Sequence, residues 1–256
     1  MKYDNHIHTK FSSDSTMQVE DALKRAAELN LALVFTEHID LGMPGNRDFA
    51  FDAKAYFNEY EKYRGKNLSL GVEVGLTKER IDENSAFVKS APFDQIIGSI
   101  HILRGVDLYP PDIYSVREKK SLYSDYLLQM AHLIYHNPFI NILGHIDYIA
   151  RYATYDDPRL LYDDFAEEID EVLRALITTD TVFELNTRRL SKETAEELLP
   201  IYERYRELGG RYATIGSDAH NAASIGNNYE TAENLLEMAK LTAVTFYEGR
   251  MEISKD

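Results

Sequence analysis

The sequence predicts an α/β protein built from parallel strands, most of them followed by a helix. Seven short apolar runs of strand length alternate with segments whose apolar residues recur at helical spacing. Strands and helices in alternation form parallel βα units with right-handed crossovers, and parallel barrels carry their active sites at the C-terminal ends of the strands. The 256 residues suit one large domain or two small ones. Because α/β barrels of this length are commonly one domain, we expect a single domain over residues 1–256.

Each of the seven expected strands ends in a polar residue. The strands are expected at 3–8, 31–35, 68–72, 93–100, 139–143, 181–185 and 212–216. Thr16 is expected to cap the helix that follows the first strand, and Asp157 is expected to cap a helix that runs to residue 177. Further helices are expected at 81–88, 121–136 and 192–208, and a last apolar stretch covers 243–247.

The composition argues against several classes of protein. Hydrophobic residues make up 44% of the chain, enough for a substantial core, and the absence of cysteine excludes disulfides and thiolate metal sites. A net charge of −15 repels phosphodiester backbones, so we expect no nucleic-acid partner. No apolar run is long enough to span a bilayer, and the chain enters its first strand without a basic and apolar signal segment. We therefore expect a cytoplasmic protein without a membrane partner.

Histidine is concentrated at the strand ends. Six of the eight histidines lie there with Glu73 and Asp218, namely His6, His8, His38, His101, His145 and His220. Side chains at positions i and i+2 of a strand point to the same side, so His6 and His8 face one place. Imidazole and carboxylate ligands suit Zn, Mn or Fe ions. Eight such groups are too many for one ion and predict two or three divalent ions, an arrangement suited to displacement at phosphorus or carbonyl centres.

Several residues have an alternative, structural interpretation. A single histidine at a strand end is more often a hydrogen-bonded structural group, and only the recurrence at corresponding positions favours metal binding. His132 and His136 lie i, i+4 on a helix that precedes a strand, so we expect them to be structural. Glu37 is expected to support a metal ligand rather than to bind an ion itself.

The ordered motifs resemble those of the PHP (polymerase and histidinol phosphatase) superfamily. They are His6-Ile7-His8, Thr36-Glu37-His38, Glu73, Ser99-Ile100-His101, Gly144-His145-Ile146-Asp147 and Ser217-Asp218-Ala219-His220. The resemblance covers about residues 3–225, and the runs 144–152 and 184–187 are similar to the histidinol-phosphate phosphatase branch. It implies a distorted seven-stranded (β/α)7 barrel with the active site at the C-terminal ends of the strands.

The resemblance also implies how the ligands divide among up to three ions. His6, His8, Glu73 and Asp218 would hold the first, and Glu73 would bridge to a second held by His101 and His145. His38 and His220 would hold the third. Many relatives have another histidine in the loop after the first strand, where this chain has Asp14. Because a carboxylate can replace imidazole at such metals, we expect Asp14 to be a ligand of the third ion.

The implied activity is hydrolysis of L-histidinol phosphate to L-histidinol and phosphate, a step of histidine biosynthesis. Metal-activated hydroxide would attack phosphorus, with Glu73, Asp218 and His220 as catalytic residues. The candidates for substrate binding are Asn186, Arg188, Arg189 and Arg151. Relatives often have an arginine a few residues after the Asn of the sixth strand; here Arg188 and Arg189 come sooner, and Arg151 is a further candidate. The loop 41–52 is expected to cover the site, with Asp48 and Asp52 facing the ammonium group of the substrate.

Two alternatives remain open from the sequence. One is a phosphoesterase of the same superfamily that acts on another small phosphate ester or a nucleotide. The other is a non-enzymatic metal-binding module, against which the polar residues at every strand end argue. The metal's identity and the oligomeric state do not follow from the sequence.

Overall fold

The computed structural model describes residues 1–45 and 49–254. Within this part of the chain, nine strands form one sheet in the order β1-β2-β3-β4-β7-β8-β9-β10-β11. Neighbouring strands run parallel, except for the antiparallel pair β10–β11. The strands are β1 (Lys2–Ile7), β2 (Leu31–Ile39), β3 (Leu68–Gly75), β4 (Ile96–Ser99), β7 (Ile142–Leu143), β8 (Val182–Asn186), β9 (Tyr212–Gly216), β10 (Thr242–Tyr247) and β11 (Arg250–Ile253). A separate hairpin joins β5 (Ile102–Leu103) to β6 (Val106–Asp107).

The first and seventh of the parallel strands meet at their C-terminal ends. Ile7 forms a parallel bridge with Ala219, and the amide of His8 donates to the carbonyl of Ala219 over 2.9 Å. Asp4, fully buried on β1, accepts hydrogen bonds from the amides of Ser217 (2.8 Å) and Gly226 (2.9 Å). These contacts curve the sheet, so the end of β9 lies beside the end of β1.

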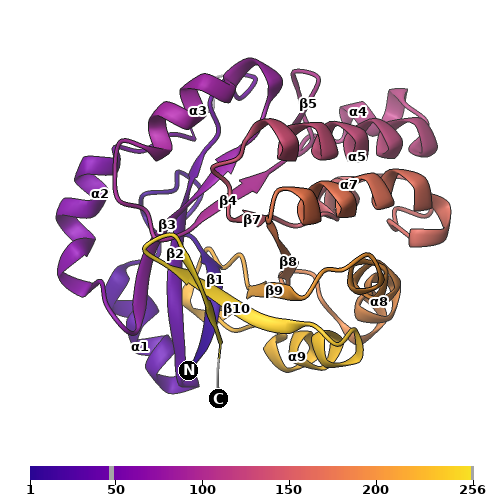
Figure 1. Cartoon of the computed structure of the whole chain (residues 1–256). Coiled ribbons are helices and arrows are strands. Elements are labelled where there is room, and N and C mark those ends of the chain that lie inside the picture. The colour runs from indigo at the N-terminus through magenta and orange to yellow at the C-terminus, as the bar shows by residue number, and fades with distance from the viewer. Residues whose placement is uncertain (46–48, 255–256) are drawn as a thin grey trace.

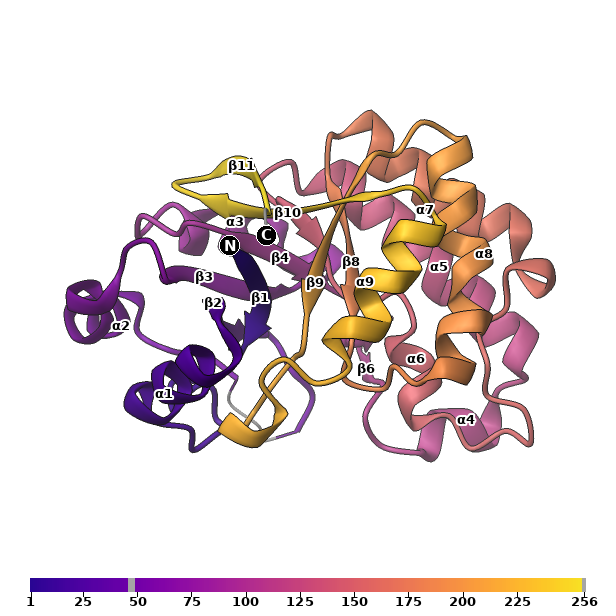
Figure 2. The same cartoon turned by 90° about the horizontal axis from the view of Figure 1, so that it is seen from below.

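Helices surround the strands (Figures 1 and 2). They are α1 (Val19–Leu29), α2 (Ala53–Tyr60), α3 (Ile81–Val88), α4 (Asp112–Val116), α5 (Lys119–His136), α6 (Tyr148–Tyr152), α7 (Ala166–Thr178), α8 (Lys192–Glu207) and α9 (Tyr229–Met238). Every residue of β2 and β3 is buried, as expected for parallel strands covered on both faces. In Figure 2, β1 points toward the end of the molecule where β6, α4 and α6 lie, and the hairpin β10–β11 lies at the opposite end.

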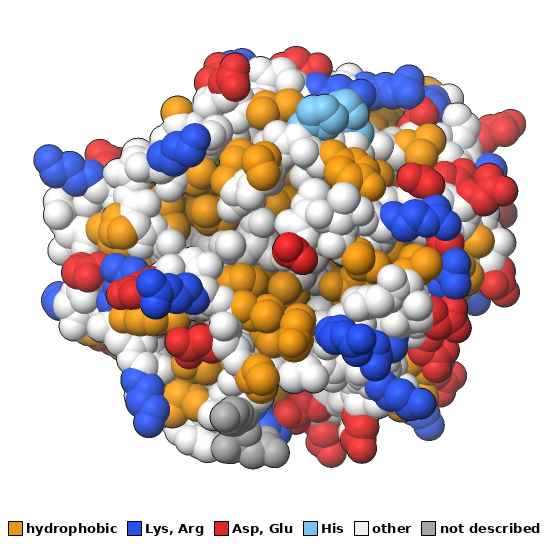
Figure 3. Space-filling model, viewed as in Figure 1, with side chains coloured by type: hydrophobic (Ala, Val, Ile, Leu, Met, Phe, Trp, Pro, Cys, Tyr) orange, Lys and Arg blue, Asp and Glu red, His pale blue; other side chains and the backbone are white. Residues whose placement is uncertain are grey.

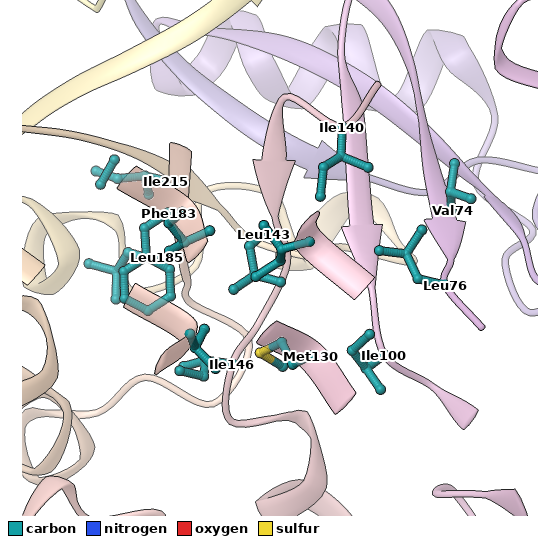
Figure 4. Close-up of a cluster of buried hydrophobic side chains, with 14 of the residues drawn as sticks. Val74, Leu76, Ile100, Met130, Ile140, Leu143, Ile146, Phe183, Leu185 and Ile215 are labelled. Carbon is teal, nitrogen blue, oxygen red and sulfur yellow. The ribbon is translucent and has the colours of Figure 1, made fainter. Parts of the chain in front are cut away.

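The core fills the space between the strands and the helices. In Figure 4, Leu143 of β7 lies between Phe183 and Leu185 of β8 on one side and Leu76 and Ile100 on the other. All five side chains are at most 1% exposed. Figure 3 shows the face of the molecule seen in Figure 1, where hydrophobic side chains gather near the middle and charged ones lie mostly around the rim. Met251 and Ile253 of β11 are exposed large hydrophobic residues.

The α/β class and the parallel sheet are confirmed, and the seven predicted runs overlap β1, β2, β3, β4, β7, β8 and β9 in turn. Two helix starts were predicted wrongly. Helix α1 begins at Val19, after an extended Gln18, so Thr16 does not cap it. Helix α7 begins only at Ala166, and the carboxylate of Asp157 instead accepts from the backbone and side chain of Arg159. Among the described residues, no helix combines the length and the apolar character needed to cross a membrane.

Candidate metal centre and active site

The polar residues that end the parallel strands come together at one cavity of about 350 Å³. His38, His101, His145, Asp218 and His220 line this cavity, and His6, His8 and Glu73 lie buried beside them. His6 lies in β1 and His8 just after it, His38 in β2 and Glu73 in β3. His101, His145 and the pair Asp218 and His220 follow β4, β7 and β9. Seven of these eight residues are at least 91% buried, and His220 is partly exposed at the mouth. The parallel strands place the groups side by side because each strand ends at the same edge of the sheet.

Glu73 lies at the centre of this cluster. Its carboxylate oxygens lie 2.9 Å from His38 Nδ1 and from His145 Nε2. The Nε2 atoms of His6, His101 and His8 lie at 3.3, 3.4 and 3.5 Å. Burial would raise the pKa of Glu73, but the neighbouring imidazoles, His6 and His38 first, hold that pKa well below its usual range. A buried carboxylate that stays ionised here is a natural partner for cations.

Several buried atoms of the cluster have no hydrogen-bond partner among the described residues. They are His6 Nε2, His8 Nε2 and His145 Nδ1. Leaving polar atoms unpaired in the interior is costly, and native proteins rarely do so without a reason. Four sets of three side chains hold their ligand atoms within 4.8 Å of one another: His6–Glu73–His145, His6–His8–Asp218, His8–His38–His220 and His38–Asp40–His101. Imidazole and carboxylate donors so arranged fit divalent metal ions.

Three of the histidines have the Nδ1 atom held by a hydrogen bond, which leaves Nε2 directed into the cluster. His6 Nδ1 lies 2.6 Å from Glu184 Oε1, and His101 Nδ1 lies 2.6 Å from Asp40 Oδ1. His8 Nδ1 lies 3.1 Å from the hydroxyl of Ser12. Such outer partners fix the ring orientation and the tautomer of a metal-binding histidine.

The partner of Ser12 is Glu37, which supports the cluster from behind. The hydroxyl of Ser12 donates to Glu37 over 2.6 Å, and the amide and hydroxyl of Thr9 donate to the same carboxylate. Burial raises the pKa of Glu37, while these donors lower it. Glu37 therefore reaches His8 only through Ser12, the indirect kind of role expected for it.

Sequence reasoning missed Asp40 and Glu184. Both obey the same spacing as the residues that were found: Asp40 follows His38 by two residues, and Glu184 precedes Asn186 by two. Glu184 also accepts from the amide of His145 over 2.7 Å. The signal was therefore present in the strand periodicity but was not applied to these two carboxylates.

Asp218 is fixed by two arginines. Arg151 donates to Asp218 Oδ2 over 2.7 Å and to Asn186 Oδ1 over 2.8 Å. Arg188 donates to Asp218 Oδ1 over 3.1 Å and lies 3.1 Å from His220 Nδ1. Burial raises the pKa of Asp218, but Arg151 and His6 hold it well below the usual range. Asp218 has a left-handed backbone, φ 53°, a conformation that Asp tolerates better than most residues.

Asp14 lies at the mouth of the cavity. Its Oδ2 atom is 3.1 Å from His220 Nε2 and 3.6 Å from His38 Nε2. Burial alone would raise the pKa of Asp14. The hydrogen bond from His220 and the charge of His38 outweigh burial, so the pKa of Asp14 lies below its usual value. The position agrees with a ligand near these two histidines.

The far part of the cavity is lined by aromatic side chains. The ring of Tyr148 lies 4.8 Å from that of His101 and 5.4 Å from that of Tyr152, which in turn lies 4.9 Å from that of Tyr109. Asp107, on β6, and Met43 also line the cavity, whereas the ring of Phe49 lies 5.6 Å from that of His38. The cavity thus has histidine, arginine and carboxylate side chains at one end, and a cluster of tyrosines at the other.

Other candidates lie elsewhere. Arg189 is exposed and lines a separate, smaller cavity with Asp147 and Arg159, so it does not share the pocket of Arg151 and Arg188. Asp52 caps α2, where its carboxylate accepts from the amides of Lys54 and Ala55. Asp48 lies outside the described residues.

The two remaining histidines form a pair at the surface. The rings of His132 and His136 stack 4.0 Å apart on α5, and neither lines the cavity. This agrees with the structural role expected for them.

Comparison with known proteins places this site in a class. The family model of the PHP domain matches residues 4–188. A chain solved in the "cryo-EM structure of archaeal Ribonuclease P with mature tRNA" is similar in fold, with a TM-score of 0.52, 16% identity and coverage of 93% of this chain and 82% of the other. At that identity the likeness extends to the fold alone.

More similar relatives narrow the class. A probable histidinol-phosphatase of Clostridium acetobutylicum is 44% identical over 98% of both chains. The histidinol-phosphatase of Lactococcus lactis is 29% identical over 100% of this chain and 97% of the relative. Its crystal structure with zinc, L-histidinol and phosphate superposes with a TM-score of 0.91 over 98% of both chains. The chain therefore belongs to the PHP family, in its histidinol-phosphatase branch.

Proposed function

We propose that this protein is a metal-dependent phosphomonoesterase that hydrolyses L-histidinol phosphate to L-histidinol and phosphate in histidine biosynthesis. The observation that carries the proposal is full-length similarity to histidinol-phosphatases, 44% identity over 98% of the chain in the Clostridium relative. The cluster of eight imidazole and carboxylate side chains around Glu73 supports it. A cavity with basic and aromatic ends suits a substrate that joins a phosphate to an imidazole ring.

Two or three divalent ions, Zn, Mn or Fe, would be held by the strand-end residues. We assign His6, His8, Glu73 and Asp218 to the first ion, and His101 and His145, with Glu73 as bridge, to the second. His38, His220 and Asp14 would hold the third. When bound, the ions would provide a hydroxide nucleophile at neutral pH and neutralise charge on the phosphoryl oxygens.

The basic residues would position the phosphate. Arg188 is 41% exposed and faces the cavity, so its guanidinium can contact a phosphoryl oxygen while one nitrogen stays on Asp218. Arg151 is almost fully buried, and Asp218 and Asn186 hold both of its terminal nitrogens. We assign phosphate binding mainly to Arg188. We assign to Arg151 and Asn186 the positioning of Asp218. His220, which lies between Arg188 and Asp14 at the mouth, would protonate the leaving alkoxide. Asp218 is the weaker candidate for this role, because Arg151 and His6 hold its pKa well below the usual range.

The aromatic end of the cavity would select the rest of the substrate. We propose that Tyr148, Tyr152 and Tyr109 contact the imidazole ring and that the carboxylate of Asp107 attracts the ammonium group. This replaces Asp52, whose side chain is used to cap α2. Met43 and Phe49 also line the cavity, so the loop after β2 contributes to its wall.

The finer features of the fold belong to the same proposal. We take β1, β2, β3, β4, β7, β8 and β9 as a distorted seven-stranded barrel closed by the bridge between Ile7 and Ala219. Residues 1–256 would form a single domain in the cytoplasm, acting on a small-molecule phosphate ester rather than on nucleic acid.

Steady-state kinetics on a panel of phosphate esters tests the proposal. We expect kcat/KM for histidinol phosphate to exceed that for a generic aryl phosphate by at least ~100-fold, which requires about 2.7 kcal/mol of differential transition-state binding. The phosphate and the metals are common to both substrates, so the difference must come from the aromatic end of the cavity. Equal rates, or a preference for a nucleotide, would remove the assignment to histidine biosynthesis. Absence of metal-dependent ester hydrolysis would favour a metal-binding module.

A further inference from the structure

Asp40 connects the candidate metal centre to the wall of the substrate cavity. Its carboxylate is 1% exposed, with Oδ1 2.6 Å from His101 Nδ1 and Oδ2 3.6 Å from His38 Nδ1. Its backbone amide donates to the carbonyl of Phe49 over 2.7 Å, and its carbonyl accepts from the amide of Met43 over 3.3 Å. Asp40 therefore contacts the two histidines through its side chain, and through its backbone it contacts Met43 and Phe49, which line the cavity.

The neighbouring strand leaves room for this carboxylate at one position. A Cβ atom on residue 75 would lie 1.8 Å from Asp40 Oδ1 and 2.7 Å from its Cγ, so any side chain other than that of Gly75 would displace Asp40. Gly75 is not one of the glycines with a positive φ. Glycine is thus needed here for space and not for an unusual backbone conformation.

The hydrogen bond to Asp40 determines which nitrogen of His101 faces the cluster. With Nδ1 directed at Asp40, Nε2 lies 3.4 Å from Glu73 Oε1 and is directed toward the other strand ends. A carboxylate behind a histidine selects the tautomer that leaves the opposite nitrogen free to bind a metal, and it restrains the ring. His6 and Glu184 repeat the same arrangement on the other side of Glu73.

We propose that Asp40 is a positioning residue of the metal centre, which holds His101 through a carboxylate–imidazole hydrogen bond in space provided by Gly75. This inference rests on the assignment of His101 as a ligand in the proposed function. It assigns Asp40 to the outer shell, although its oxygens lie close enough to His38 and His101 for the three to bind an ion together.

Metal binding to the metal-free, full-length protein tests the proposal without any substrate, so its result does not depend on which ester the enzyme hydrolyses. Competition with a chromophoric chelator gives the affinity for Zn²⁺ or Mn²⁺, and elemental analysis at saturating metal gives the number of ions. We expect Asp40→Asn to weaken the affinity for one ion by about 10–100-fold with an unchanged number of ions at saturation. Asp40→Ala should weaken it more, because Asn keeps an acceptor oxygen for His101.

Gly75→Ala provides a second, independent test, because it displaces Asp40 while every assigned ligand is retained. We expect it to weaken binding in the same direction. Asp94→Asn is the matched control: Asp94 is fully buried and hydrogen-bonded, but to Arg64 and the amides of Leu70 and Glu248, away from the cluster. Its metal affinity should equal that of the unmodified protein.

Two results would overturn the proposal. Unchanged affinity in folded Asp40→Asn and Gly75→Ala, with folding checked by circular dichroism, would show that Asp40 does not position His101. Permanent loss of one ion at saturating metal in Asp40→Asn would show that Asp40 is itself a ligand. If Asp40→Ala does not fold, the isosteric Asn variant and Gly75→Ala decide between these results.

Discussion

Glu73 is the side chain on which the candidate metal centre depends most. Five imidazoles lie within 3.5 Å of its carboxylate, and the side chain is fully buried. We expect Glu73→Gln to lower the metal content and to reduce kcat/KM by more than about 100-fold, since changes in residues that only support the ligands already cost 10–100-fold in affinity or activity. Elemental analysis and steady-state kinetics on the same preparations measure both effects.

His132 and His136 provide the control for that experiment. They are the two histidines that lie outside the cluster of strand-end residues, so replacing either by alanine should leave metal content and rate close to those of the unmodified enzyme. Comparable losses in Glu73→Gln and His132→Ala, with both variants folded, would mean that the metal centre is assigned to the wrong residues.

Asp14 lies at the mouth of the cavity, and we assign it to the third ion. Its carboxylate lies 3.1 Å from His220 and 3.6 Å from His38. We expect Asp14→Ala to weaken binding of the third ion by roughly 10-fold or more, whereas Asp14→His should retain much of the affinity because imidazole is an equivalent ligand. An alanine variant with unchanged metal content and rate would identify Asp14 as a residue of the turn only.

At the residue scale, sequence periodicity located the strand-end groups but not their partners. His6 and His8 are recognisable because a ligand pair at i, i+2 needs no knowledge of the fold. The link from Asp40 to His101 joins residues 61 positions apart, and the link from His6 to Glu184 joins residues 178 apart. Such contacts depend on the register between strands, which a single sequence does not specify. The same reason explains why Arg189 could not be separated from Arg188.

At the scale of elements, the carboxylate of Asp52 caps a helix and was predicted to bind the substrate. It was expected to face the substrate, but its carboxylate accepts from two amides in the first turn of α2. We expect Asp52→Ala to lower the free energy of unfolding by about 1 kcal/mol, the usual cost of losing an N-cap, and to leave the ratio of kcat/KM between histidinol phosphate and an aryl phosphate unchanged. Denaturant unfolding and the kinetic panel measure the two effects.

Asp52→Ser is the matched variant, because serine also caps helices. It should recover most of the stability. A loss of substrate preference in both variants would instead show that Asp52 contributes to substrate binding.

Helix starts were the least predictable elements, for a physical reason. Ser191 caps α8 through a reciprocal pair of hydrogen bonds with Thr194, and there the helix begins where the pattern predicts. Helices α1 and α7 begin without a side-chain cap. Their first turns are fixed by packing against the sheet rather than by local sequence, so a Thr or Asp-Pro nearby misled the prediction.

At the scale of the whole molecule, the alternation of strands and helices was sufficient to predict the class of fold. The contacts that join β9 to β1 were not predictable, because they combine a backbone bridge at Ile7 with the buried carboxylate of Asp4. The strands β10 and β11 extend the sheet beyond this junction. The junction brings Asp218 and His220 next to His8, and so completes the cluster.

The assigned ligands come from the ends of six different strands, so bound ions would also hold the sheet together. A ligand that binds only the folded state stabilises it by about 2.7 kcal/mol at a concentration 100 times its Kd. For a protein of this size that corresponds to a rise in Tm of about 5–10 °C. We therefore expect a chelator to lower Tm by this amount and to abolish ester hydrolysis, and added Zn²⁺ or Mn²⁺ to restore both. Glu73→Gln is the control, because its Tm should respond much less to chelation. If elemental analysis shows that the metal is gone while Tm and activity are unchanged, the ions contribute to neither, and the proposed metal centre is wrong.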